Sequence, residues 1–210
     1  LQFKTLLLPI NQFINPSLSA NVVAEYLVRG LIDASYVVNS LKTINKVKKN
    51  IFQTIIHYDG SDLKQVKNGV RHGEAVMEGG NLTKDLGNLP PNICTPTYLS
   101  NEAVKLKKIN KLIKVTVLDE AKMKSLGMGS LLSVSQGSKQ PAKLVSIEYM
   151  PLKNKAPIVL VGKGITFDTG GISLKPSPNM DEMKFDMSGA GSVIGTMKAV
   201  AEMNIKTNVV

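Results

Sequence analysis

Residues 161–190 have the sequence VGKGITFDTGGISLKPSPNMDEMKFDMSGA and connect two segments of different character. The segment before them, residues 157–162, is apolar at successive positions, which is typical of a central parallel strand covered on both faces. The segment after them, residues 188–203, carries apolar residues at helical spacing. Ligands of open α/β sheets bind beyond the carboxyl ends of the strands. We therefore expect the functional site in this connection.

Lysine and aspartate side chains recur along the connection with glycines between them. Asp168 follows Lys163 by five residues, Lys175 follows seven later, and Asp186 eleven later. Paired glycines after Asp168 allow backbone angles closed to other residues, and Asp186 lies just before the predicted helix, where a carboxylate is favoured. Two aspartates suit Mg²⁺, Mn²⁺ or Zn²⁺. A lysine beside them is either a deprotonated ligand or base, or a protonated group that stabilises an oxyanion.

Two other interpretations fit the same residue types. Lysine–aspartate pairs in glycine-rich loops are commonly solvated turns. The sequence GKG at 162–164 occurs in phosphate-binding loops, but GxxxxGK[ST] is absent and the short match is weak by itself. Residue type and spacing do not distinguish between a metal site, a solvated turn and a phosphate-binding loop.

Longer motifs in the chain resemble those of the leucyl (cytosol) aminopeptidase family. They are VGKGITFDTGGISLKP (161–176) followed by MDEMKFDMSGAGSVIG (180–195), together with GGNLTKDLGNLPPNICTPTYLS (79–100) and LGMGSLLSVSQGSKQPAKLVSIEYM (126–150). The resemblance covers residues 60–210 well and residues 1–59 poorly.

The resemblance implies a role for each motif residue. Asp168 is expected to bridge two metal ions, and Lys163 to bind one of them as a neutral amine. Asp186 is expected to bind that same metal and to lie close to the substrate's amino group. Lys175 is the expected catalytic residue, polarising the scissile carbonyl and holding the tetrahedral intermediate. Met183 is expected to line the pocket for the substrate's N-terminal side chain.

The resemblance also implies the reaction and its partners. The expected enzyme releases N-terminal residues, leucine and similar ones by preference, from peptides. It would use two divalent metal ions per subunit (Mn or Zn, or else Mg), a hydroxide that bridges them, and bicarbonate as a candidate general base. A cytoplasmic homohexamer is expected.

One departure from the family pattern concerns the second signature, NTDAEGR, which does not occur in the 210 residues. In the family it supplies the remaining acidic ligands and the arginine that holds bicarbonate. The chain begins without methionine and ends on Val209-Val210, which resembles the start of a strand. We therefore expect a fragment of a longer enzyme, with part of the site outside it.

Composition limits the other classes of function. The formal net charge is +10, which can attract nucleic acid, so a DNA-binding or regulatory protein is one alternative and a non-catalytic family member is another. The lysine runs lack interleaved aromatic residues, which favours a solvated surface. They are Lys42, Lys46, Lys48 and Lys49, then Lys105, Lys107, Lys108, Lys111 and Lys114.

Other residue counts and motifs limit the class further. The single cysteine, Cys94, permits no internal disulfide and is expected to be a buried, inert thiol. There are two histidines and no HExxH motif, which excludes a histidine-rich zinc site. We expect no secretory signal in the opening LQFKTLLLPI, because it is not a charged segment followed by a long apolar one. No apolar run approaches the ~20 residues that a membrane span requires.

The predicted fold class is α/β. Residues 1–59 are expected to be the end of an N-terminal α/β domain, residues 60–90 a linker helix that ends at Pro90-Pro91, and residues 91–210 the first part of a mixed-sheet catalytic domain. Predicted strands are 5–10, 51–57, 114–118, 143–149 and 157–162. Predicted helices are 17–34, 97–112 (capped by Thr97), 119–126 and 188–203, with 131–135 either helix or strand.

Overall fold

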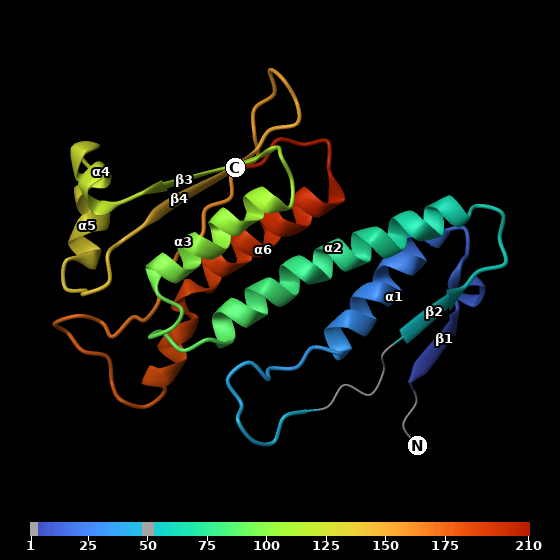
Figure 1. The fold of residues 1–210 in the computed structure, drawn as a ribbon, viewed down its shortest axis with the longest axis horizontal. Coiled ribbons are helices and arrows are strands. Elements are labelled where there is room, and N and C mark those ends of the chain that lie inside the picture. Colours follow the sequence, from blue (N-terminus) through green and yellow to red (C-terminus); the bar gives the residue numbers. More distant parts are fainter. Residues whose placement is uncertain (1–3, 48–52) are drawn as a thin grey trace. The chain divides into compact units, whose positions relative to one another are not determined.

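The computed structural model describes residues 4–47 and 53–210, and these form two compact units, Leu1–Asn81 and Leu82–Val210. Both units combine helices with strands (Figure 1), in agreement with the predicted α/β class. None of the described helices combines the length and apolarity that crossing a membrane requires. The predicted division into 1–59, 60–90 and 91–210 stays a prediction.

The first unit is a strand–helix–strand arrangement. Strand β1 (Thr5–Pro9) pairs in parallel with β2 (Gln53–His57), from Thr5 opposite Gln53 to Pro9 opposite His57. Helix α1 (Ala20–Ala34) lies between them in sequence, and a short 3-10 turn (Asn11–Phe13) follows β1. Strand–helix–strand order favours such parallel pairing, and the structure has it. The first residues of the predicted second strand, 51–52, lie outside the described residues.

Helix α2 (Leu63–Asn88) is a single helix that runs through its internal glycines. Glycine inside a helix costs about 1 kcal/mol relative to alanine, and two of these glycines have a packing reason. A Cβ on Gly69 would lie 2.1 Å from the carbonyl oxygen of Asn21, and one on Gly73 would lie 2.7 Å from that of Glu25. Glycine therefore allows α2 to approach the backbone of α1 within the first unit.

The second unit begins with α3 (Pro96–Lys105), whose cap differs from the prediction. The side chain of Thr95, not Thr97, accepts the Tyr98 backbone N–H at 3.2 Å, and Pro96 occupies the first turn. The helix also ends earlier than the predicted residue 112, because a 3-10 turn (Leu106–Lys108) follows it. Asn110 ends the segment by accepting the Leu112 N–H and donating to the Ala201 carbonyl.

An antiparallel pair forms the strands of the second unit. Strand β3 (Ile113–Leu118) pairs with β4 (Leu144–Tyr149), and between them lie α4 (Glu120–Ser125) and α5 (Gly129–Ser135). The structure thus shows a helix at 131–135, where the sequence left helix and strand open. Asp119 caps α4 by accepting the Lys122 N–H at 2.8 Å.

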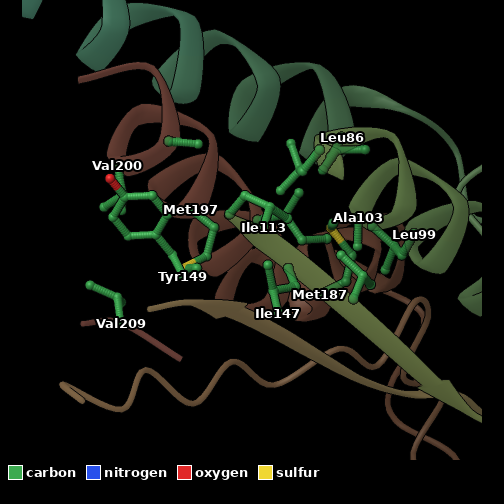
Figure 2. Packing of buried hydrophobic residues seen from close by; sticks show 14 of the residues in the cluster. Leu86, Leu99, Ala103, Ile113, Ile147, Tyr149, Met187, Met197, Val200 and Val209 are labelled. Atoms are coloured by element: carbon green, nitrogen blue, oxygen red, sulfur yellow. The ribbon is translucent and has the colours of Figure 1, made fainter. Parts of the chain in front are cut away.

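Helix α6 (Ser188–Met203) provides one side of the second unit's core. Figure 2 shows Met187, Met197 and Val200 beside Ile113, Ile147 and Tyr149 of the two strands. The hydroxyl of buried Tyr149 donates to the Ile205 carbonyl at 3.1 Å, so its polar end is satisfied. The apolar stripe predicted for this helix therefore faces the core.

Residues 157–162 do not form the buried central strand that the sequence predicted. Ile158 alone makes a parallel bridge, to Val209, and Val209 also bridges Tyr149 of β4 in antiparallel sense. Val161 is 91% exposed. Ile158 and Val159 are also exposed, whereas Leu160 packs partly against the core and its N–H donates to the Val210 carbonyl at 2.8 Å. At Val209-Val210, where the sequence predicts the start of a strand, the structure has only these isolated bridges.

Asn208 holds the turn between β4 and residue 158. It is 1% exposed, and its amide donates to the carbonyls of Leu152 and Lys155 at 2.8 and 2.7 Å. Its side-chain oxygen accepts the Leu152 N–H at 2.9 Å. The side chain thus replaces the backbone partners that this irregular segment lacks.

Replacing Asn208 with alanine should strongly destabilise the second unit. The change removes three hydrogen bonds, two to the carbonyls of Leu152 and Lys155 and one from the Leu152 N–H, and each is worth roughly 0.5–1.5 kcal/mol. We expect the free energy of unfolding, measured by urea denaturation, to fall by about 2–4 kcal/mol. Asn101→Ala on the exposed face of α3 is the matched control, with a change within about 0.5 kcal/mol. Equal stability of the two variants would contradict the assignment.

Cys94 is buried in the second unit's core, at 1% exposure. Burial, with a smaller effect of Glu102, raises the pKa of the Cys94 thiol to about 11. The folded state therefore favours the neutral thiol, and stability falls as pH rises above the pKa of the unfolded thiol. The expectation that this thiol is buried is confirmed.

Native Cys94 should react slowly with Ellman's reagent at pH 8. With a pKa of about 11, only about one thiol in a thousand is ionised at that pH, and the thiolate is the nucleophile. The same thiol should react fast in 6 M guanidinium chloride. Rapid reaction of the native protein would show that the thiol is accessible.

Candidate functional site

The residues singled out by the sequence lie on one loop and the turn that follows it. The loop leaves the Ile158 bridge, passes Lys163, Asp168 and Lys175, and ends in a 3-10 segment (Met180–Met187). Asn179, in the left-handed conformation at φ 61°, precedes that segment. Met183 and Asp186 lie within it, and α6 begins directly after Met187. All five predicted site residues are therefore on the second unit.

Lys163 and Asp186 form the first lysine–carboxylate pair. Nζ of Lys163 lies 3.0 Å from Oδ2 of Asp186. The lysine side chain is exposed, whereas Oδ2 of Asp186 is buried and receives no hydrogen bond of acceptable angle from Lys163 or from another donor in residues 4–47 and 53–210. The carboxylate is thus held by the charge of Lys163 and not by a well-aligned hydrogen bond. An amine nitrogen beside an unsatisfied carboxylate oxygen is a donor set suited to a borderline cation.

Asp168 and Lys175 form the second pair. Nζ of Lys175 donates to Oδ2 of Asp168 at 2.9 Å, and the Gly170 N–H donates to Oδ1 at 2.8 Å. The hydrogen bond from Lys175, followed by that from Gly170, lowers the pKa of the Asp168 carboxyl. The carboxylate is thus favoured in the folded chain, and this contribution to stability is lost as pH falls through the lowered pKa.

Glycine makes the turn after Asp168 feasible. Gly170 and Gly171 have φ of 89° and 78°, in the left-handed region. The chain then folds back so that the Lys175 N–H donates to the Thr169 carbonyl at 2.9 Å. The glycine pair noted in the sequence therefore brings Lys175 back to Asp168.

Met183 contacts Lys175, and the sequence did not predict this contact. Nζ of Lys175 donates to the Met183 thioether sulfur at 3.0 Å as well as to Asp168. The sulfur is a weak acceptor. No sequence signal indicates this contact, because the two residues are on different turns of an irregular loop.

A metal centre of this chain would use Lys163, Asp168 and Asp186 as donors. Across residues 4–47 and 53–210, no three His, Cys, Asp or Glu side chains gather closely enough to hold a metal ion. The lysine nitrogen and the unsatisfied Asp186 oxygen fit a cation together. The residues present therefore fit part of a metal centre.

The second lysine run predicted from the sequence lies at the surface. All its members are exposed, but Lys105 pairs with Glu102, and Lys114 lies 3.9 Å from Glu148. These glutamates reduce the local positive charge. Nucleic-acid binding stays a hypothesis that no contact in the described residues favours.

Comparison with known families accounts for these motifs. The family model "Cytosol aminopeptidase family, catalytic domain" matches residues 81–210, more than half of the chain. The chain belongs to the cytosol aminopeptidase family. The resemblance inferred from the motifs is thereby confirmed.

Curated members of the cytosol aminopeptidase family are similar over most of the chain. A probable cytosol aminopeptidase of Thioalkalivibrio sulfidiphilus is 60% identical over 151 residues, which is 71% of this chain and 30% of that protein. The cytosol aminopeptidase of Pseudomonas aeruginosa is 49% identical over 192 residues, 91% of this chain and 39% of that protein. The matched part of the chain thus spans 30% to 39% of the length of these relatives.

Solved structures share the fold. A tomato leucine aminopeptidase variant superposes with a TM-score of 0.82 at 28% identity, covering 99% of this chain and 40% of that one. The bottromycin maturation enzyme BotP in complex with Mn gives a TM-score of 0.81 at 27% identity, covering 99% and 42%. The α/β arrangement is therefore that of the cytosol aminopeptidases.

Proposed function

We propose that this chain is part of a metal-dependent aminopeptidase that releases N-terminal residues, with leucine and similar residues preferred, from peptides. The observation that carries the proposal is the pair of lysine–carboxylate contacts on one loop, Lys163 with Asp186 and Lys175 with Asp168. Membership of the cytosol aminopeptidase family supports the reaction class.

Three side chains would hold the metal ions. Lys163 and Asp186 would bind one cation together, and Asp168 would bridge it to a second. Mn or Zn is the proposed metal, with Mg as the alternative, and the Mn complex of the similar BotP structure supports a divalent ion. Two such ions, when bound, lower the pKa of water and polarise a carbonyl.

The remaining roles belong to side chains that face the substrate. Asp186 would attract the substrate's amino group through its negative charge, which Lys163 approaches without a hydrogen bond of acceptable angle. Lys175 would donate to the scissile carbonyl oxygen. Its ammonium already donates to two neighbours, Asp168 and Met183, so little reorganisation is needed when charge develops on that oxygen. Met183 would contact the substrate's N-terminal side chain.

Other parts of the proposal concern the longer protein. We propose that a segment of the NTDAEGR type supplies further acidic ligands and the arginine that holds bicarbonate as a general base. Residues 1–59, 60–90 and 91–210 would be the end of an N-terminal domain, a linker helix and the first part of the catalytic domain. The assembled enzyme would be a cytoplasmic homohexamer that accepts peptides.

Hydrolysis of leucine p-nitroanilide by the full-length protein tests the proposal. Activity should disappear after chelation and return with Mn²⁺ or Zn²⁺. Asp168→Ala should lose both metal and activity. Lys175→Ala should keep its metal content, measured by atomic absorption, while kcat falls by about 10²- to 10³-fold, as for the loss of one oxyanion donor.

Lys153→Ala, an exposed lysine outside the site, is the matched control and should retain full activity. A full-length protein that binds metal but hydrolyses no aminoacyl anilide or peptide would be a non-catalytic family member, and the proposal would be wrong. Salt-sensitive binding to DNA by that protein would then support the regulatory alternative.

Met183→Ala should change side-chain preference. Removing the thioether side chain enlarges the proposed pocket, so kcat/KM for leucine p-nitroanilide should fall by about 10- to 100-fold. Met183→Leu keeps most of the volume and should lose much less. Met180→Ala, in the same 3-10 segment, is the control. Equal loss for leucine and alanine anilides would show that Met183 does not select the side chain.

A further inference from the structure

The backbones of residues 162–163 and 189–190 lie in unusually close contact. A Cβ on Gly162 would lie 2.5 Å from the Gly189 carbonyl oxygen and 2.8 Å from the Ala190 Cα. A Cβ on Gly189 would lie 2.9 Å from the backbone nitrogen of Lys163. Real Cβ atoms do not approach backbone atoms this closely, so only glycine at both positions permits the contact.

A hydrogen bond joins the same two segments. The Ala190 N–H, in the first turn of α6, donates to the Lys163 carbonyl at 2.7 Å. First-turn N–H groups of a helix have no partner within the helix, so the loop satisfies one of them. The contact thereby ties the loop to the start of α6.

The contact lies next to the first lysine–carboxylate pair in sequence. Lys163 directly follows Gly162, and Asp186 lies three residues before Gly189. The Lys163 side chain is long and 60% exposed, so packing alone does not hold it. Its position relative to Asp186 depends on where its backbone is held.

Core packing does not explain these glycines. Gly189 is exposed and Gly162 is only partly buried, whereas a small residue needed for core packing would be buried. The atoms that exclude a Cβ are mainly backbone atoms of the two segments themselves. The close approach therefore serves the relative position of the loop and the helix start.

We propose that Gly162 and Gly189 are positioning residues that hold Nζ of Lys163 and the Asp186 carboxylate at the separation needed to bind one cation together. The inference rests on the proposed function for its cation. A methyl group at either glycine would move Nζ of Lys163 and the Asp186 carboxylate apart, although both side chains would still be present.

Mn²⁺ binding to the full-length protein tests the inference. Free Mn²⁺ is measured by electron paramagnetic resonance in titrations of the wild type, Gly162→Ala and Gly189→Ala. In both variants the dissociation constant of the Mn²⁺ ion at Lys163 should rise about 10- to 100-fold, which is the usual effect of losing a group that orients metal ligands. Gly137→Ala is the matched control, because a Cβ there meets no atom within 4 Å.

A milder variant covers the case in which Gly162→Ala fails to fold. A Cβ on Gly164 would lie 3.2 Å from the Ala190 Cβ, so Gly164→Ala presses on the same contact with less displacement. We expect a smaller but measurable loss of Mn²⁺ affinity, with the melting temperature of the apoprotein close to that of the wild type.

The outcomes separate this inference from the proposed function. Weaker Mn²⁺ binding in folded glycine variants, beside a normal Gly137→Ala control, supports the positioning role. Variants with lower melting temperature but wild-type Mn²⁺ affinity would show a merely structural role and overturn it. A wild type that binds no Mn²⁺ would overturn the proposed metal centre itself.

Discussion

The contact between residues 162–163 and the start of α6 is the constraint on which the candidate site depends. Two glycines allow the backbones to meet, and the Ala190 N–H donates to the Lys163 carbonyl at 2.7 Å. Because α6 is packed in the core, the contact with its first turn gives the loop a defined position. With its backbone fixed in this way, the flexible Lys163 side chain has fewer conformations available and stays within reach of Asp186.

Helix α6 is itself held by the core of the second unit. Its inner face packs on β3 and β4 through Met197 and Val200 (Figure 2), and Val209 bridges both Tyr149 of β4 and Ile158. Buried Asn208 satisfies the backbone of the turn before Ile158. The core thus sets both ends of the site, the segment that enters the loop and the helix that follows it.

Local signals predicted most of the second unit and failed where the partner is distant in sequence. The glycine and proline positions, the caps and the apolar spacing indicated α4, α6, β3 and β4 nearly to their bounds. Thr95 rather than Thr97 caps α3, because both residues are good caps and Pro96 suits the first turn. Residues 157–162 were predicted as a buried strand from composition alone, but burial depends on neighbours that composition does not contain.

By itself the sequence determined the family, the α/β class and the identity of the candidate donors, Lys163, Asp168, Lys175 and Asp186, because long motifs and residue chemistry are local properties. Only the tertiary structure decided which lysine meets which carboxylate. Spacing along an irregular loop does not determine distances, since the left-handed turn at Gly170-Gly171 and the glycine contact with α6 fold it in three dimensions. The same folding places Met183 against Lys175, a contact between residues eight positions apart.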